Sequence, residues 1–232
     1  MANTHTVVVD SFEQYHQEIV GRTLQGAVFR GVPDATGHLL VPSLGRFLPQ
    51  VISKGKSVAD LLLTEEKALH LFRVECVRHL GRYPQTPWEL LSLAQHHGVP
   101  TRLLDWTVSP LVALYFAVHH SSSVDSAVYC YPDPDFLHAG EETTVDPFHL
   151  TETRAFSPPH VSARITAQQG VFTCQPDPTV PLEAPNLIQF RVPASSRAAM
   201  DNALARLGIT SRVILPDLDG LGSWIQSLHF AV

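Results

Sequence analysis

The 232-residue chain has only three cysteines (Cys76, Cys130 and Cys174), and none of them forms a Cys-x-x-Cys pair. An odd number of widely spaced cysteines indicates free thiols in a reducing compartment rather than a disulfide framework. Long apolar runs are also missing, since the longest, Leu111 to Val118, ends after eight residues. A membrane-spanning helix needs roughly 18 or more such residues, so the sequence predicts none. The chain does not begin with a positively charged segment followed by an apolar stretch, so we expect no secretory signal.

Positive charge is scarce as well. Lys and Arg total 16 against 22 Asp and Glu, which gives a net charge of −6. Proteins that coat nucleic acid are usually basic, so we do not expect this chain to coat nucleic acid. The hydrophobic fraction of 44 % is high enough to bury a core, which excludes a disordered chain. These features predict a soluble, globular, cytoplasmic protein without a membrane partner.

The expected helices lie mostly in the first half of the chain and the expected strands mostly in the second. Periodicity and end signals predict helices over 11–21, 58–82, 87–98, 111–119, 195–207 and 217–228, and strands or extended pieces over 27–31, 38–41, 127–131, 170–174, 187–192 and 212–215. The order lacks a regular alternation of strand and helix, which favours an α+β fold. We expect one domain over 1–232, with the proline- and acid-rich segment 132–160 as a mobile loop within it.

Several common catalytic signatures are absent. The sequence has no His-Glu-x-x-His, no Gly-x-Ser-x-Gly and no glycine-rich phosphate loop of the Walker or dinucleotide type. Thirteen histidines raise the question of zinc, but adjacent ones such as His96 and His97 point about 100° apart on a helix. We therefore expect no metal.

Polar residues are densest between Leu93 and Thr107, a segment that separates two mainly apolar helices. Polar side chains in such a place must be exposed, paired or hydrogen-bonded. One interpretation is structural, with Arg102 and Asp105 paired and capping helix ends. The other is a functional site that lines a pocket.

Three parts of the sequence resemble the FRG domain, a family named for its Phe-Arg-Gly motif. They are Phe29-Arg30-Gly31 with Pro42-Ser43-Leu44, the block LAQHHGVPTRLLDWTVSPLVALYFA over 93–117, and the later motifs RITAQQGVFT (164–173) and ILPDLDGL (214–221). Such domains occur mostly in bacterial and phage-linked proteins, often in defence or toxin settings. The resemblance implies a toxin or defence effector.

A weaker similarity concerns arginine-type ADP-ribosyltransferases. An aromatic-Arg-Gly at the end of an early strand resembles their first motif, and Trp106 to Pro110 before an Ala-rich helix resembles their Ser-Thr-Ser strand. Gln168-Gln169 stands where those enzymes carry a catalytic Glu. The similarity implies a fold of split β-sheets with surrounding helices, and NAD as the substrate in the cleft between them.

This similarity also implies roles for individual residues. Arg30 would bind phosphate or ribose through its planar fork, Thr107 or Ser109 would position the nicotinamide ribose, and Gln168 would bond a ribose hydroxyl. His96, Arg102, Asp105 and Trp106 would complete the NAD site, with Trp106 as either a stacking platform or a core anchor. Charge support for the transition state would come from Asp105, Asp217 or Asp219.

Each assignment has a structural alternative. Arg30 would pair with an acid, Ser109 would cap a helix, and Asp217 and Asp219 would occupy the first turn of the last helix. If the site exists, Arg30, His96, Arg102, Asp105 and Gln168 should converge on one concave surface.

Two functional hypotheses remain open. The first is an NAD-dependent ADP-ribosyltransferase or NAD glycohydrolase that acts as an intracellular toxin or phage-defence effector. Its partners would be NAD, a protein or nucleic-acid acceptor, and an antitoxin or other partner protein. The second is a catalytically inert FRG module that binds a nucleotide or a partner protein.

Overall fold

The computed structural model describes residues 4–119, 122–158 and 163–230. Its strands are β1 (His5–Val8), β2 (Val28–Val32), β3 (Leu103–Thr107), β4 (Ser126–Tyr131), β5 (Arg154–Phe156), β6 (Gly170–Cys174) and β7 (Ile188–Val192). Its α-helices are α1 (Phe12–Val20), α2 (Leu48–Ser53), α3 (Val58–Glu75), α4 (Pro87–His96), α5 (Pro110–Val118), α6 (Ala163–Gln168), α7 (Arg197–Arg206), α8 (Ser211–Ile214) and α9 (Leu218–His229). Short 3-10 turns cover Gly45–Phe47, Cys76–His79, Glu141–Thr143 and Ala194–Ser196. The predicted α+β class is confirmed.

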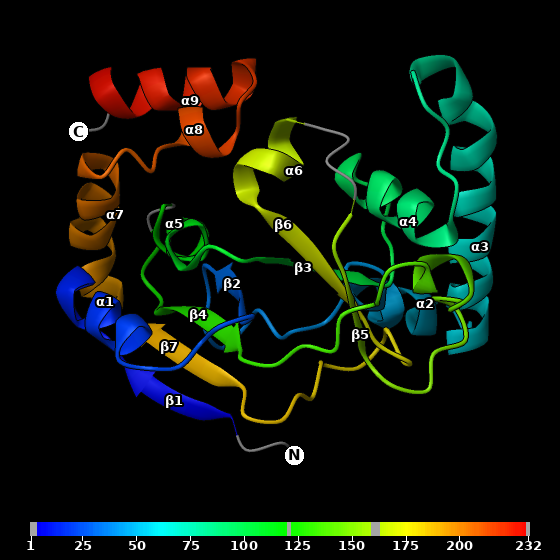
Figure 1. The fold of residues 1–232 in the computed structure, drawn as a ribbon, viewed down its shortest axis with the longest axis horizontal. Helices are drawn as coiled ribbons and strands as arrows, with labels where there is room; N and C mark the ends of the chain where they lie inside the picture. The colour runs from blue at the N-terminus through cyan, green and yellow to red at the C-terminus, as the bar shows by residue number, and fades with distance from the viewer. Residues whose placement is uncertain (1–3, 120–121, 159–162, 231–232) are drawn as a thin grey trace.

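The strands form one hydrogen-bonded sheet in the order β1-β7-β4-β2-β3-β6-β5. All neighbours are antiparallel except β1 and β7. The junction between β2 and β3 is narrow, with Phe29 and Thr107 as its one register pair, whereas β2 and β4 share five. The predicted pair of split sheets is therefore wrong, because hydrogen bonding between β2 and β3 joins all seven strands into one sheet. Figure 1 shows α1, α7 and α9 beside one part and α3 and α4 beside the other.

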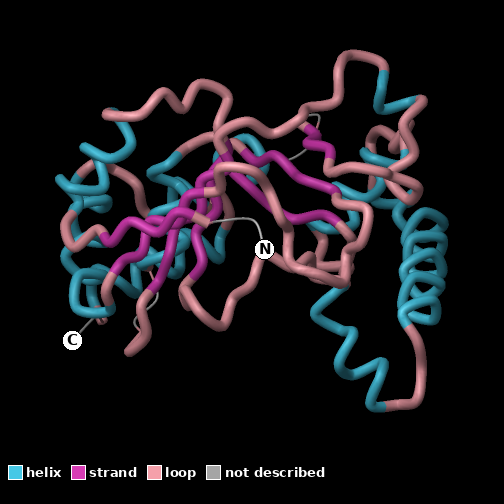
Figure 2. The backbone as a smooth tube through the Cα atoms, turned by 90° about the horizontal axis from the view of Figure 1, so that it is seen from below, coloured by secondary structure: helices cyan, strands magenta, loops and turns pink. Residues whose placement is uncertain are grey.

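Figure 2 shows α3 standing at one end of the molecule while the strands run across its middle. No described helix is long and apolar enough to cross a membrane. The three cysteines are free, as the sequence predicts, and the structure places all three in buried positions. Burial raises the pKa of Cys130 and Cys174 to about 12, so these thiols are unreactive at neutral pH.

Most predicted elements are confirmed, including the buried helix α5. Ser109 precedes Pro110, and its side chain accepts a hydrogen bond from the Val112 N–H at the start of α5. This is the serine cap and first-turn proline that the sequence predicts. Six of the nine residues of α5 are buried, as expected for a helix without a polar face.

Two predicted strands are wrong. Residues 38–41 form an irregular segment with a bend at Leu40, and among the described residues they are linked to a distant segment by the hydrogen bond from Leu182 N–H to the Leu40 carbonyl. Residues 212–215 belong mainly to α8. Val213, an apolar β-branched residue of this segment, is 45 % exposed and lies in a helix, so it does not pack against a sheet as the predicted strand required. Short apolar runs fit a strand or a helix equally well.

Segment 132–158, the described part of the predicted loop, is fastened at several points. It contributes the edge strand β5, which pairs with β6. The Val145 carbonyl accepts a hydrogen bond from Trp88 Nε1, and the Pro147 carbonyl accepts one from Arg102 Nη1. The remaining residues of the predicted loop, 159 and 160, lie outside the described part of the chain.

Gly31 lies where β2 passes closest to α5. A Cβ at this position would overlap the Ala113 carbonyl oxygen and would lie 2.7 Å from the Ala117 backbone nitrogen. The glycine of the Phe-Arg-Gly motif therefore permits a contact between strand and helix backbones.

Replacement of Gly31 by Ala is expected to lower the free energy of unfolding by about 1–3 kcal/mol, because α5 must move away from β2. Denaturant unfolding would measure the loss. Gly81→Ala is the matched control, since a Cβ there meets no atom within 4 Å. Equal stability of the two variants would contradict the close approach as the reason for Gly31.

Candidate functional site

A pocket of about 480 Å³ opens at the narrow junction of β2 and β3. We call it the Arg30 pocket. Its walls come from the end of β2, from β3, from the end of α4, and from α5 and α6. They are formed by Phe29, Arg30, Gly31, Pro33, Gln95, His96, Gly98, Asp105, Trp106, Thr107, Phe116, Arg164 and Gln168.

The centre of the pocket is the contact between Arg30 and Asp105. Arg30 Nη1 donates a hydrogen bond of 2.6 Å to the Asp105 carbonyl oxygen and lies 3.6 Å from the carboxylate oxygen Oδ2. The Arg30 side chain is 18 % exposed and that of Asp105 is 52 % exposed. Arg30 Nε is buried and has no hydrogen-bond partner among the described residues. The hydrogen bond to the Asp105 carbonyl comes from Nη1, which leaves the donors of Nη2 for an anion.

Burial lowers the pKa of the Arg30 guanidinium from its usual range, and Asp105 opposes this shift. An arginine stays protonated at neutral pH even after such a lowering. The structural alternative for Arg30, a pair with an acid, is therefore present in the fold. The two charged groups are 3.6 Å apart, and the Asp105 side chain is exposed to the pocket.

Gln95 holds the Asp105 carboxylate in place, a role that the sequence did not indicate. Its Nε2 donates to Asp105 Oδ2 at 3.0 Å and to the Leu103 carbonyl at 3.3 Å. Its Oε1 accepts a hydrogen bond of 2.7 Å from Thr101 Oγ1. The amide is therefore fixed from both ends, and the carboxylate is oriented toward the pocket. The one indication of Gln95 in the sequence was its position beside His96, within the polar segment between Leu93 and Thr107.

Thr107 and Gln168 meet on the opposite wall. Thr107 Oγ1 donates to the Gln168 carbonyl at 2.7 Å and accepts from the Ser109 N–H at 3.0 Å. The Gln168 side chain donates to the Ile214 carbonyl at 3.3 Å, which ties α6 to α8. Ser109 itself does not line the pocket, and its side chain caps α5. Thr107 and Gln168 therefore stand at the site, while Ser109 supports the helix behind it.

Trp106 is a core residue that is also part of the pocket lining. It is 3 % exposed and packs in the apolar cluster that covers β2, β3 and β4. Its Nε1 donates a hydrogen bond of 2.9 Å to Thr173 Oγ1 on β6. A ring so enclosed cannot offer a whole face to a ligand, which favours the anchor over the stacking platform.

Arg102 lies outside the pocket. It is 4 % exposed and pairs with the buried carboxylate of Glu65 on α3, not with Asp105. Arg102 immediately precedes β3, and residues three apart along an extended chain point to opposite faces. The predicted Arg102–Asp105 pair is therefore wrong, and of the five residues expected to converge, Arg30, His96, Asp105 and Gln168 line one pocket.

Asp217 and Asp219 also lie away from the Arg30 pocket. Asp217 caps α9, where its side chain accepts a hydrogen bond of 2.8 Å from the Gly220 N–H, and Asp219 stands in the first turn. Their structural alternative is confirmed. Asp105 is the one carboxylate among the residues that line the pocket.

His96 closes the pocket from the end of α4. It is half-buried, and its ring makes no hydrogen bond within the described part of the chain. Partial burial lowers the pKa of His96, and the neighbouring His97 and Arg164 lower it further. His96 is therefore largely neutral at pH 7. Arg164, an exposed residue of α6 that the sequence did not single out as a site residue, brings a second positive charge to the lining.

Comparison with protein families identifies an FRG domain over residues 25–126. No curated protein and no solved structure matches the chain. The matched range includes Arg30, Gln95, His96, Asp105, Trp106 and Thr107, and the walls formed by Arg164 and Gln168 lie beyond it. Among the residues described, no group of three or more His, Cys, Asp or Glu could hold a metal ion.

Proposed function

We propose that this chain, which contains an FRG domain in residues 25–126, binds NAD in the Arg30 pocket and cleaves its nicotinamide–ribose bond. The observation that carries the proposal is one half-exposed carboxylate, Asp105, held within a pocket whose lining also includes the two arginines Arg30 and Arg164. The products would be ADP-ribose, when water is the acceptor, or an ADP-ribosylated protein or nucleic acid.

The positive charges of the pocket suit the pyrophosphate of NAD. Arg30 and Arg164 outnumber the one lining carboxylate, so the pocket has an excess of fixed positive charge. An arginine with donors to spare binds a phosphate through two parallel hydrogen bonds. Phe116, which is partly exposed, adds an apolar wall against which a ring can lie.

Asp105 suits the other half of the reaction. Cleavage of the bond between nicotinamide and ribose passes through an oxocarbenium-like state, as in glycoside hydrolysis. A carboxylate that Gln95 and Arg30 already orient needs no rearrangement to stabilise that positive charge. Asp105 would therefore stabilise the positive charge of this state, which Gln168 cannot do because its side chain is neutral.

The biological role follows from the chemistry. An intracellular enzyme that consumes NAD or modifies macromolecules harms the cell that contains it. The role of a toxin or phage-defence effector, controlled by an antitoxin or other partner protein, is therefore part of the proposal.

The second candidate is a nucleotide-binding module without catalysis. Gln168 favours it, because Gln stands in place of a catalytic Glu and its amide is already bound to the Ile214 carbonyl. Incubation with NAD labelled in the adenosine half separates the candidates. We expect release of nicotinamide together with labelled ADP-ribose or labelled macromolecules. Binding without release would establish the inert module instead.

Arg30→Lys is expected to weaken NAD binding about ten- to a hundredfold, because lysine keeps the charge and loses the fork. The melting temperature should change little, since lysine retains a donor for the Asp105 carbonyl. Calorimetric titration with NAD beside a melting curve measures both effects.

Arg22→Lys is the matched control for this variant. Arg22 pairs with Glu18 on the surface of α1 and has no part in the pocket. Its affinity for NAD should equal that of the wild type. Unchanged affinity of a folded Arg30→Lys variant would remove Arg30 from the site.

A further inference from the structure

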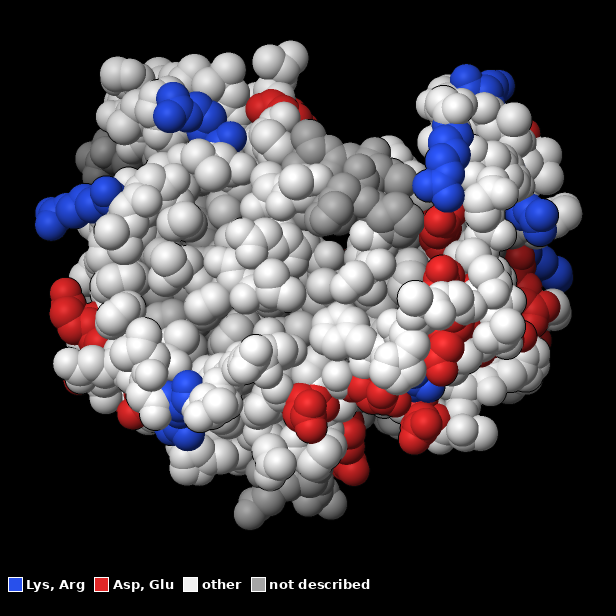
Figure 3. All heavy atoms as spheres, in the orientation of Figure 1, with Lys and Arg blue, Asp and Glu red and all other residues white. Residues whose placement is uncertain are grey.

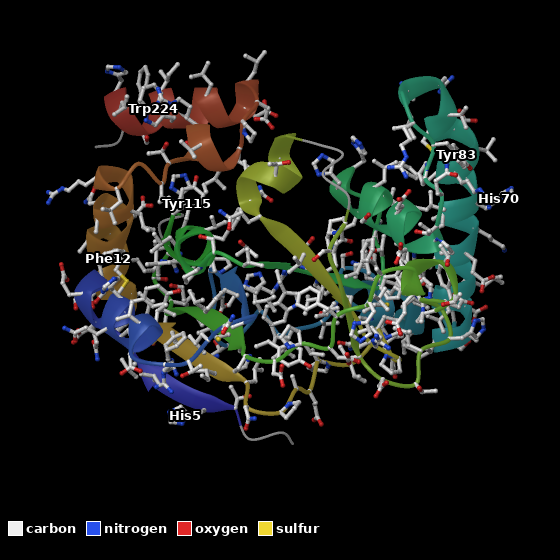
Figure 4. The ribbon with its side chains drawn as sticks, in the orientation of Figure 1. His5, Phe12, His70, Tyr83, Tyr115 and Trp224 are labelled. Atoms are coloured by element: carbon white, nitrogen blue, oxygen red, sulfur yellow. The ribbon has the colours of Figure 1, made fainter. Side chains whose placement is uncertain are left out.

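A second pocket, of about 570 Å³, adjoins α4 on its other side. We call it the Tyr83 pocket. It is formed by the segment that precedes α4, by one face of that helix and by the residue after it, through Leu80, Gly81, Arg82, Tyr83, Pro84, Glu89, Ser92, Leu93, His96 and His97. Figure 4 shows Tyr83 at the end of the molecule that α3 and α4 occupy.

His96 lines both pockets and is the residue that their linings share. Its neighbours divide between them, since Gln95 faces the Arg30 pocket and His97 the Tyr83 pocket. The rings of His96 and His97 lie edge to face with their centroids 4.9 Å apart. The His96 imidazole is thus placed between the site proposed for NAD and a separate cavity.

The Tyr83 pocket suits an uncharged ligand. Leu80, Pro84 and Leu93 supply apolar wall. The charges of Arg82 and Glu89 are paired at 3.2 Å, and the Glu89 carboxylate also accepts a hydrogen bond from the Gln85 N–H. Among the described residues of this lining, Arg82 is the one Lys or Arg, and Glu89 compensates its charge. On the face drawn in Figure 3, Lys and Arg side chains lie at the upper end of the side that α3 occupies, and Asp and Glu side chains lie below them, so charges of both signs surround this end of the molecule.

We propose that the Tyr83 pocket receives the acceptor of the ADP-ribosyl group, a hydroxyl compound with an apolar carrier, and that His96 is its general base. This inference rests on the proposed function and adds to it a substrate class and a catalytic residue.

The step balances with one base. The bond between ribose C1′ and the nicotinamide nitrogen breaks, and its electron pair neutralises the pyridinium ring. A lone pair of the acceptor hydroxyl forms the new bond to C1′. The hydroxyl proton moves to the free imidazole nitrogen of His96, which later releases it to solvent.

The groups around His96 favour the neutral form of its imidazole, which is the form that can accept a proton. Arg30, Asp105 and Arg164 face His96 across the Arg30 pocket, and Arg82, Tyr83, Glu89 and His97 face it from the Tyr83 pocket. Burial and the nearby positive charge lower the pKa of His96, so the neutral form that accepts a proton persists to lower pH. The rate should therefore be constant above that pKa and fall as the pH drops below it.

His96→Gln tests the base. We expect NAD affinity within about threefold of the wild type and hydrolysis reduced by about 10²–10⁴-fold, which is the usual contribution of a general base. The fall in rate at acidic pH should vanish as well. With azide as the acceptor, an anion with no proton to lose, the variant should form ADP-ribosyl azide nearly as fast as the wild type. His16→Gln on the surface of α1 is the control and should behave as the wild type.

Alcohols test the pocket. When methanol and 1-butanol compete, the yield of ADP-ribosyl ether should favour the longer alcohol by about fourfold for each additional buried methylene. Gly81→Trp, a change for which the backbone leaves open space, should abolish that preference by filling the pocket. A blocked Leu-Thr-Leu tripeptide as the acceptor distinguishes a polypeptide side chain from a small alcohol.

The outcomes separate the two proposals. A wild-type protein that releases no nicotinamide overturns both the proposed function and the role of His96. An active wild type whose His96→Gln variant hydrolyses NAD equally fast, or loses azide transfer to the same degree as hydrolysis, overturns the general base alone. Equal use of methanol and 1-butanol overturns the acceptor pocket.

Discussion

Replacement of Glu65 by Ala is expected to lower the free energy of unfolding by about 3–5 kcal/mol. Glu65 is 1 % exposed on α3, and its carboxylate accepts hydrogen bonds from the backbone N–H, Nε and Nη2 of Arg102. Removal of the carboxylate leaves the guanidinium buried with the Pro147 carbonyl and the face of the Phe148 ring as its remaining contacts. A buried charge without a counter-ion accounts for the size of the loss.

Urea unfolding of the wild type and the variant would measure this effect. Glu75→Ala is the control, because Glu75 pairs with Arg78 on the surface, where both side chains are more than half exposed. An exposed pair contributes about 1 kcal/mol or less. Comparable losses in the two variants would contradict the importance of burial. The double variant Glu65→Leu with Arg102→Met should recover part of the stability, since it removes both charges together.

Trp106→Ala should likewise cost about 3–5 kcal/mol, the usual result of emptying a buried aromatic site. The indole is 3 % exposed, packs near the Tyr131 ring and donates to Thr173 Oγ1. The substitution would open a cavity and leave the Thr173 hydroxyl without its donor. Because Asp105 and Thr107 flank Trp106 on β3, the Arg30 pocket should lose its shape with the core.

Thermal unfolding with and without NAD checks this prediction. A melting temperature far below that of the wild type, in both conditions, is the expected result. Trp106→Phe serves as the control, because it keeps an aromatic ring in the core and should lose much less. A Trp106→Ala protein that melts like the wild type and fails only to bind NAD would make the indole a ligand platform.

Both predictions concern the strand β3 and the residue before it, which the sequence patterns did not identify as a strand. Four of the five residues of β3 are buried and Asp105 is exposed, so the strand has no alternation of apolar and polar residues. Sheets reveal themselves in a sequence chiefly through that alternation. The edge strands β1 and β5 were missed because each has four residues or fewer.

Local signals were sufficient for much of the remaining fold. The caps at Ser109 and Asp217, the buried helix α5, and the strands β4, β6 and β7 depend on interactions within a few residues or on a continuous apolar run. Such features are determined by neighbouring side chains and depend little on the packing of distant segments. The motif residues that line the Arg30 pocket, Arg30, His96, Asp105 and Gln168, were indicated instead by the resemblance of their segments to known families.

Pairing between distant segments could not be predicted in this way. The partner of Arg102 is Glu65, 37 residues earlier, and the partner of Arg30 is Asp105, 75 residues later. Spacing along the sequence indicated Arg102 with Asp105, but the extended chain turns these two side chains to opposite faces. The sequence thus specified which residues are chemically capable and which helices begin at a cap. The register of β2 against β3, and the placement of α3 and α4 against that junction, determined which of these residues share a pocket, because burial and pairing depend on the whole packed chain.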